Sequence, residues 1–326
     1  MRDVTFVCCI ESGPLEEQTV SMIESLRKWG GAWSNKPVVA VTPRIGPPLT
    51  RSTRKALKDL NVEHLNFVAD NKYAWKAFLN KHFSMAAVEE KCNTEYLCWL
   101  DSDLLILKEP VEFDLVHDVD FLACPSDSAG ATRGGNDEME QYWRRVCENL
   151  NVDFDSLPWV TTQMENEKIR FYFNSGVFLY RRDTQLSKHH LENTIKFFDS
   201  KITSNVTGTF FTQHILGLTV HKLNLKWKEL SVTHNYPIGS ASIESWRNCS
   251  ELSDVHIFHY HDSMWQPCYQ EFVQTLKGVA SEQAEWLGAK GPLKNNATIP
   301  SKIFKKLLEL KRGKQEARFI RDSSIV

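Results

Sequence analysis

The chain has 326 residues, of which 42% are hydrophobic and 25% are charged, which is typical of a soluble protein with one large α/β domain or two small ones. The net charge of −2 argues against a global attraction to nucleic acid, and no apolar run reaches the about 18 residues of a membrane span. Eight cysteines in a chain of this length do not indicate a disulfide framework, and the absence of a Cys-x-x-Cys pair argues against a thiolate zinc site. The first residues do not show a signal-peptide pattern, so we expect a cytoplasmic protein.

Strands and helices alternate from the first residues of the chain. The β-branched apolar run at 4–10 predicts a buried strand. The next segment, 15–31, repeats apolar residues near helical spacing and ends at two glycines, which commonly terminate helices. This alternation predicts a mostly parallel sheet with helices on both faces. By the same criteria the next expected elements are strands at 36–43, 63–68 and 95–107, and helices at 53–62 and 71–92.

The second half of the chain mixes shorter strands with helices. Residues 126–137 are rich in Gly, Ser and Thr and predict a loop near a site. Residues 170–182 predict a strand pair or a bent strand that is interrupted at 174–176. The other expected elements are strands at 119–125, 230–237 and 255–261, and helices at 138–152, 191–200 and 209–223.

The end of the chain differs in composition from the rest. Residues 287–300 contain many Gly, Pro and Asn residues and predict a linker, and residues 301–321 hold eight Lys or Arg and only two Glu. Three interpretations stay open: a docked terminal helix, a basic amphipathic helix on a membrane surface, and a contact to an acidic partner. We expect a main domain at 1–280, followed at 281–326 by a linker and a basic amphipathic helix. The apolar residues that can share one face of this helix are Ile303, Phe304, Leu307, Leu308 and Leu310.

Asp101 and Asp103 interrupt an apolar run in the stretch WLDSDLLIL. Two carboxylates in a buried strand cost stability unless something satisfies them. In open α/β sheets ligands bind beyond the carboxyl ends of strands, where acids two positions apart can aim at one hard cation. Mg²⁺ and Mn²⁺ accept a few carboxylates together with phosphate oxygens of a substrate. The alternative is a turn whose acids cap a helix.

Two further stretches contain groups that can bind sugars, phosphates or metals. In FNSGVFLY, Asn174 can hydrogen-bond a sugar hydroxyl and Gly176 allows a close backbone approach, although a β-bulge with a polar turn gives the same pattern. In VHIFHYHDSMWQP, His259 and His261 alternate along an expected strand and would share one face, where they can bind a metal or a phosphate. Solvated histidines on a strand are the alternative.

Five stretches in order resemble the GT-A-fold glycosyltransferases, most closely the glycogenin-like and bacterial galactosyltransferase-like group. They are WLDSDLLIL, FNSGVFLY, TQHIL, HNYP and IFHYHDSMWQP, and the resemblance spans about residues 4–267. It implies a Rossmann-like mixed sheet, mostly parallel and flanked by helices. It also implies an Mn²⁺- or Mg²⁺-dependent glycosyltransferase that moves a sugar from a nucleotide diphosphate sugar, with a UDP-sugar favoured, to a glycan or another hydroxyl acceptor.

The same resemblance implies roles for individual residues. Asp101, Asp103 and His259 match metal ligands, and Asp101 would also contact the donor. Lys81 matches a lysine that contacts the donor, while Gln213 matches a glutamine beside the sugar, so that Gln213 and Asp101 are the expected catalytic residues. The other expected substrate-binding residues are Asn174 and Gly176 at the donor sugar, Ile10 and Glu11 at the nucleotide base, Ser102 between the two aspartates, and His261 at the leaving diphosphate.

The sequence departs from the family pattern in three places. Thr212 stands where the family has an aspartate before the glutamine, so a retaining and an inverting outcome both stay open. The family's Gly and Lys-Pro-Trp after the histidine are missing, and His261 is the candidate for the lost contact to the diphosphate. The first strand is followed by CIESGPLEEQT, which is not the glycogenin-like pattern, so the base preference stays open.

Several polar and aromatic residues are candidates for acting on the acceptor. An inverting enzyme needs a base for the acceptor hydroxyl, and the candidates are Asp127, Asp137 and Glu138. In a retaining enzyme the departing phosphate itself can take that proton. Trp143 and Trp159 are candidates for stacking on an acceptor sugar, with burial in the core as the more common alternative.

Two other classes of function compete with sugar transfer. A nucleotidyltransferase also uses a sheet, carboxylates and a divalent ion, but the acidic ESGPLEEQ after the first strand would repel a triphosphate. A non-catalytic nucleotide-sugar-binding protein on the same fold is consistent with Thr212. The expected substrates are a nucleotide diphosphate sugar and a glycan or lipid-linked acceptor. The C-terminal helix is also expected to contact a membrane surface, which would make the cytoplasmic protein peripheral to the membrane. Nucleic acid is not expected as a partner.

Overall fold

A seven-stranded mixed sheet forms the centre of the computed structural model, which describes residues 3–203, 211–246 and 250–325. β9 runs antiparallel to both of its neighbours, and the other pairs in the described sheet are parallel. This is the mostly parallel sheet that the sequence predicts. Across the sheet the strands are β11 (Trp227–Glu229), β6 (Phe121–Cys124), β9 (Asn174–Arg181), β4 (Tyr96–Leu100), β1 (Val4–Cys9), β2 (Val38–Thr42) and β3 (Glu63–Asn66).

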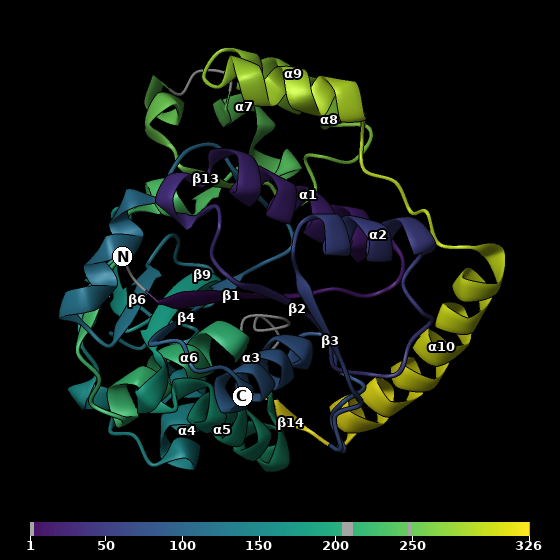
Figure 1. Ribbon diagram of the computed structural model, residues 1–326. Coiled ribbons are helices and arrows are strands. Elements are labelled where there is room, and N and C mark those ends of the chain that lie inside the picture. Colours follow the sequence, from purple (N-terminus) through teal and green to yellow (C-terminus); the bar gives the residue numbers. More distant parts are fainter. Residues whose placement is uncertain (1–2, 204–210, 247–249, 326) are drawn as a thin grey trace.

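Helices cover both faces of this sheet because its side chains alternate between two apolar clusters. In β1, Val7 and Cys9 point into one cluster, and Phe6 and Cys8 point into the other. Figure 1 shows α1 and α2 on one side of the sheet and α3 to α6 on the opposite side. The bounds are α1 (Pro14–Trp29), α2 (Arg51–Asp59), α3 (Leu79–Lys91), α4 (Glu140–Leu150), α5 (Leu186–Ser200) and α6 (Phe211–Lys222).

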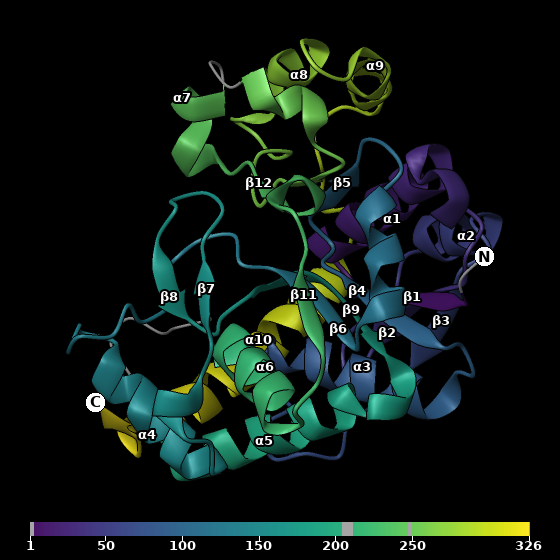
Figure 2. The same cartoon turned by 90° about the vertical axis from the view of Figure 1, so that its left-hand side faces the viewer.

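A third apolar cluster lies beyond the sheet and is built mainly from the C-terminal part of the chain. It includes Phe258 from a three-stranded sheet and Leu287 from a helix. Figure 2 shows this layer beyond one end of the main sheet, with β5 and β12 lying below α7, α8 and α9. The elements here are β5 (Leu104–Ile106), β12 (Tyr236–Pro237), β13 (Ile257–His259), α7 (Ile243–Trp246), α8 (Tyr269–Lys277) and α9 (Ser281–Lys290).

The longest helix, α10 (Ile299–Arg321), runs along the outer edge of the molecule (Figure 1). None of its residues is buried. After α10, β14 (Ser324–Ile325) pairs with β10 (Ile202–Thr203). A separate hairpin is formed by β7 (Trp159–Thr161) and β8 (Lys168–Arg170). No helix among the described residues is long and apolar enough to cross a membrane.

Four predicted elements differ from the structure. The strand expected at 95–107 is two strands, β4 and β5, which belong to different sheets and are joined by a turn at 101–103. The helix expected at 71–92 begins only at Leu79, because turns at 71–78 carry the side chains of Tyr73 and Trp75 into the core. Asn174–Gly176 do not interrupt a strand but begin β9. The strand expected at 230–237 is instead a 3-10 helical turn at Val232–His234, and only Tyr236–Pro237 form a strand, β12. The helix expected at 209–223 is confirmed as α6 (Phe211–Lys222), and residues 209–210 lie outside the described part of the chain.

Candidate active site

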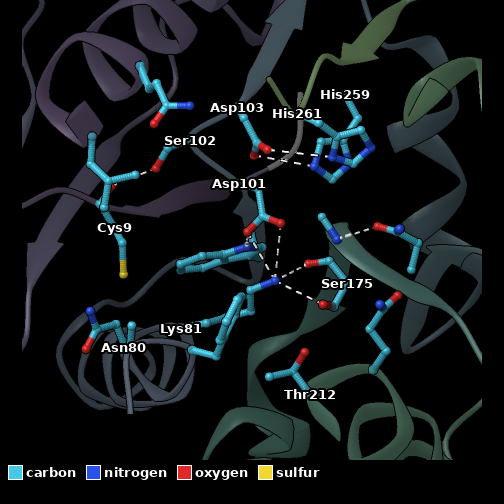
Figure 3. A pocket seen from close by; sticks show the side chains of 18 of the residues that line it. Cys9, Asn80, Lys81, Asp101, Ser102, Asp103, Ser175, Thr212, His259 and His261 are labelled. Carbon is cyan, nitrogen blue, oxygen red and sulfur yellow. Dashed lines mark hydrogen bonds and ion pairs between the residues drawn. The ribbon is translucent and has the colours of Figure 1, made fainter. Parts of the chain in front are cut away.

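A pocket of about 610 Å³ opens at the carboxyl ends of β1, β2 and β4. This is the edge where ligands bind in open α/β sheets. Figure 3 shows side chains from the main sheet, from α3 and from the layer of the third cluster converging on it. Most of the residues expected from the sequence line it: Glu11, Lys81, Asp101, Ser102, Asp103, Asn174, Gly176, Gln213, His259 and His261.

The turn between β4 and β5 positions both aspartates and is fixed from three sides. The Asp101 amide donates to the carbonyl of Gly176 at 2.9 Å. The Ser102 hydroxyl donates to the carbonyl of Cys9 at 3.0 Å, and the Asp103 carbonyl accepts from the Tyr260 amide at 2.9 Å. Because these bonds tie the turn to three separate segments, the two carboxylates have little freedom to move.

Asp101 is held by neighbouring protein groups. The Trp99 indole donates to its carboxylate at 2.7 Å, and the Lys81 ammonium lies 3.1 Å away. Lys81 also donates to the carbonyl and the hydroxyl of Ser175, at 2.7 and 3.0 Å. Its charge therefore stands in the pocket between β9 and the aspartate (Figure 3).

Asp103 faces His259 and His261, which lie side by side with ring centroids 4.1 Å apart (Figure 3). Nε2 of His259 is 3.4 Å and Nδ1 of His261 is 3.8 Å from the Asp103 carboxylate. One ligand atom from each residue lies within 4.8 Å of the other two, which makes them a candidate metal site among the described residues. One carboxylate and two imidazoles form a donor set that fits a divalent transition metal such as Mn²⁺.

His261 reaches this cluster by a route that the sequence pattern did not predict. β13 ends at His259, so the two histidines do not alternate along one strand. His261 lies in the following turn with φ of 51°, a left-handed conformation that turns its ring back beside His259. Asp262 accepts hydrogen bonds from the amide and the hydroxyl of Ser240, which fixes the turn.

The electrostatics of the cluster favour charge on both sides of the Asp103–His259 contact. Burial alone would raise the pKa of Asp103, but attraction to His259 and the hydrogen bond between them outweigh it, so the pKa is lowered. Burial would lower the pKa of His259, but Asp103 raises it above its usual value. A positive charge between these groups is therefore favoured, which is also what a bound cation provides.

A chain of amides behind His259 fixes which ring nitrogen faces Asp103. The Gly176 amide donates to Oδ1 of Asn174 at 2.8 Å, and the same oxygen accepts from Nδ2 of Asn235 at 2.9 Å. The Asn235 oxygen must then face Nδ1 of His259, 3.1 Å away, and accept its proton. Nε2 therefore faces Asp103, and once it releases its proton its lone pair can bind a metal.

The other end of the pocket is lined by Glu11, Arg44 and Asn80. Nη2 of Arg44 donates to Glu11 at 2.8 Å, and Asn80 donates to it at 2.9 Å. Burial would raise the pKa of Glu11, but Arg44 lowers it below the usual value. Ile10, which was expected beside Glu11 in the pocket, instead points into the core, because successive side chains after β1 alternate between the two faces of the sheet.

The remaining candidates separate into residues at the pocket and residues away from it. Thr212, Gln213 and Asp127 line the pocket, and the buried Oε1 of Gln213 has no hydrogen-bond partner in the described structure. Asp137 is outside the pocket lining, and its carboxylate accepts hydrogen bonds from the amides of Arg133, Met139 and Glu140. Glu138 is exposed and also outside the lining.

Neither Trp143 nor Trp159 lines the pocket. Trp143 is completely buried and donates to the carbonyl of Gly130 at 3.0 Å. Trp159 is 38% exposed, but the Arg170 guanidinium lies 4.0 Å from its ring centre and Lys168 lies 5.2 Å from it.

Sequence reasoning missed several groups that complete the site. Arg44 follows β2 at the same edge as the aspartates, so a survey of polar residues after each strand would have found it. Ser175 is next to two predicted residues, and Asn80 precedes Lys81. Asn235 stands in the HNYP stretch, but only the folded chain brings it to His259.

Solved structures of glycosyltransferases share the fold of this chain. Among solved structures, the ligand-free bifunctional glycosyltransferase WbbM has 12% identity and a TM-score of 0.53, covering 89% of this chain and 52% of its own. An active-site mutant of LgtC has 12% identity and a TM-score of 0.50, covering 90% of this chain and 97% of its own. Mouse xyloside xylosyltransferase 1 has 13% identity and a TM-score of 0.45, covering 79% of this chain and 98% of its own. At these identities WbbM and LgtC show the fold, and this chain spans about half of WbbM.

The sequence itself places the protein in a family. The model of the Rhodobacterales glycosyltransferase domain matches residues 6–224, which is more than half of the chain. The chain therefore belongs to that glycosyltransferase family, and the prediction from the ordered stretches is confirmed at this level. No curated protein matches the sequence.

Proposed function

We propose that the protein is a metal-dependent glycosyltransferase that moves a sugar from a nucleotide diphosphate sugar to a hydroxyl of a glycan or lipid-linked acceptor. The observation that supports this most is the Asp103–His259–His261 cluster, which opens into the same pocket as Asp101 and Lys81. UDP is the favoured nucleotide because of the resemblance to the galactosyltransferase-like group. Mn²⁺ is favoured over Mg²⁺ because two of the three ligand atoms are imidazole nitrogens, whereas Mg²⁺ prefers oxygen.

Asp103, His259 and His261 would hold the metal, and Asp101 would contact the donor. A bound divalent ion supplies positive charge that offsets the negative charge on a leaving diphosphate. Lys81 adds a fixed positive charge to the same pocket, and its bonds to Ser175 keep the ammonium group in place. His261, whose side chain is 44% exposed, lies at the open side of the cluster, where it can also meet a phosphate.

Gln213, Asn174 and Asp127 would act on the sugars. The oxygen of Gln213, which has no hydrogen-bond partner among the described residues, can accept a hydrogen bond from a sugar hydroxyl, which would orient the donor. Asp127 is the only one of the three proposed bases that lines the described pocket, and in an inverting reaction it would take the proton of the acceptor hydroxyl. In a retaining reaction the leaving phosphate would take that proton.

The test is a thermal-shift screen of the full chain with UDP, GDP, CDP and dTDP, each with Mn²⁺, with Mg²⁺ and with EDTA. A ligand that binds only the native state raises the melting temperature by mass action. We expect UDP with Mn²⁺ to give the largest shift, and Asp103→Asn to remove it. Hydrolysis of the matching nucleotide sugar by the wild type then separates an enzyme from a binding protein. A metal-independent shift, or none with any nucleotide, would contradict the proposal.

A further inference from the structure

Helix α10 presents apolar side chains to the outside of the molecule instead of to the core. Ile299, Ile303, Leu307 and Leu310 are 73%, 58%, 60% and 56% exposed. Their spacing of four, four and three residues places them on one face of a helix, which we call the apolar stripe. A helix that docks through its apolar face would bury these residues, so the stripe is not used in packing the described part of the protein.

The opposite face of α10 binds to the body of the protein mainly through polar contacts. Lys305 donates to the carbonyl of Ser12 at 2.8 Å, and Arg312 donates to the carbonyl of Ile45 at 2.5 Å. Glu316 forms an ion pair with Lys76 at 2.6 Å. Near the end of the helix, Phe319 packs against Tyr73, Trp75 and Phe198. These contacts hold the helix in one orientation and keep the stripe facing outward along the edge seen in Figure 1.

Lysines accompany the apolar stripe on both sides. With 3.6 residues per turn, Lys302 and Lys306 lie along one side of the stripe and Lys311 lies along the other, while Lys314 follows the stripe one turn beyond Leu310. All four are exposed. Of the eight Lys or Arg from 299 to 321, Lys305 and Arg312 contact the body, and the other six outnumber the exposed Glu309, so the outer surface is positive although the whole chain carries a charge of −2.

We propose that this face of α10 binds the surface of an anionic phospholipid membrane, with the apolar stripe between the acyl chains and the lysines at the lipid headgroups. An apolar stripe bordered by lysines is the pattern of helices that lie in the plane of a membrane surface. A second copy of the chain fits less well, because two α10 helices packed through their stripes would bring lysines against lysines. The surface thus matches a lipid layer in both its apolar and its charged parts.

Vesicle flotation of the full chain tests this inference. The vesicles are phosphatidylcholine alone and phosphatidylcholine mixed with phosphatidylglycerol, each at low and high salt. We expect binding to the mixed vesicles only, weakened by salt. The stripe variant Ile303→Ser with Leu307→Ser should lose at least about tenfold in binding. The charge variant Lys302→Gln with Lys306→Gln should lose about 25-fold, since each lysine near an anionic surface changes affinity about fivefold.

Matched controls change the same chemistry elsewhere on the surface. Val111 and Met164 are 51% and 42% exposed, and replacing both by serine should leave vesicle binding unchanged. Lys58 and Lys277 are exposed on α2 and α8, and replacing both by glutamine should have little effect. Circular dichroism and melting temperature check that each variant is folded. Binding that is equal in wild type and stripe variant overturns the proposal, as does self-association of the wild type without vesicle binding in analytical ultracentrifugation.

Discussion

Replacing Gly176 by alanine is expected to disturb the candidate metal site without changing any of its ligands. A Cβ atom built on Gly176 lies 2.6 Å from Cε1 and 2.8 Å from Nδ1 of His259. Gly176 does not have a positive φ, so the added methyl group brings no backbone strain. The effect of the substitution is therefore steric, and it comes from the contact with His259 and from a tight approach to Oδ1 of Asn174, 3.0 Å from the added Cβ.

The size of this effect follows from the contact distances. Carbon atoms in van der Waals contact are about 3.5 Å apart, so the His259 ring must retreat by about 0.9 Å. His259 is buried and bonded to Asn235, so this retreat breaks the amide chain and moves Nε2 relative to Asp103. Disturbing the groups behind a metal ligand typically costs about 10- to 100-fold in metal affinity. Overpacking costs a further about 1–3 kcal/mol of unfolding free energy.

Two measurements separate the metal site from the packing. Isothermal titration calorimetry gives the Mn²⁺ affinity, and urea unfolding in EDTA gives the stability without metal. Gly288→Ala is the control, because a Cβ there meets nothing within 4 Å and its position in α9 predicts equal or greater stability. Wild-type affinity and stability in Gly176→Ala would refute the argument from contacts. No Mn²⁺ binding by the wild type would instead refute the metal proposal, and the stability measurement would still test the contact.

Two further predictions concern Asn235 and His214. Asn235→Leu removes the acceptor that holds the proton on Nδ1 of His259, and calorimetry should show Mn²⁺ binding weakened about 10- to 100-fold; unchanged binding would exclude a positioning role. Burial lowers the pKa of His214 to about 3, so the folded state keeps it neutral, and below about pH 6.5 the unfolded state alone takes up its proton. His214 therefore lowers the unfolding free energy by about 1.4 kcal/mol between pH 7.5 and about pH 5.5. In urea unfolding, the unfolding free energy of His214→Gln should therefore fall by about 1.4 kcal/mol less than that of the wild type between pH 7.5 and about pH 5.5. The same pH dependence in both proteins would contradict the lowered pKa of His214.

The sequence predicted the main sheet because its strands follow a simple rule. β1 and β4 are apolar on both faces, as strands covered by helices on both sides must be, and each is followed by polar residues at its carboxyl end. That end is where Asp101 and Glu11 enter the pocket. Position along a strand thus indicated which acids face the ligand, and alternation of side chains would also have excluded Ile10.

The rest of the site depends on contacts that have no local sequence signal. The run 95–107 looks like one strand because β4 and β5 are both apolar, and nothing nearby indicates that the second joins another sheet. The left-handed turn at His261 is equally hidden, since few residues other than glycine adopt that conformation. Asn235 and His259 pair across 24 positions, and the helix start at Leu79 reflects burial of Tyr73 and Trp75 before it.

The change of sheet between β4 and β5 explains why both aspartates can stand in an apolar run. If the strand continued, Asp101 and Asp103 would lie on the same side of it, since residues two apart share a face. The turn instead sends Asp101 toward Lys81 on α3 and Asp103 toward the two histidines at the end of β13 and in the turn that follows it (Figure 3). Each carboxylate thus meets positive charge from a different layer of the fold, and the pocket between them is open to a ligand that carries its own negative charge.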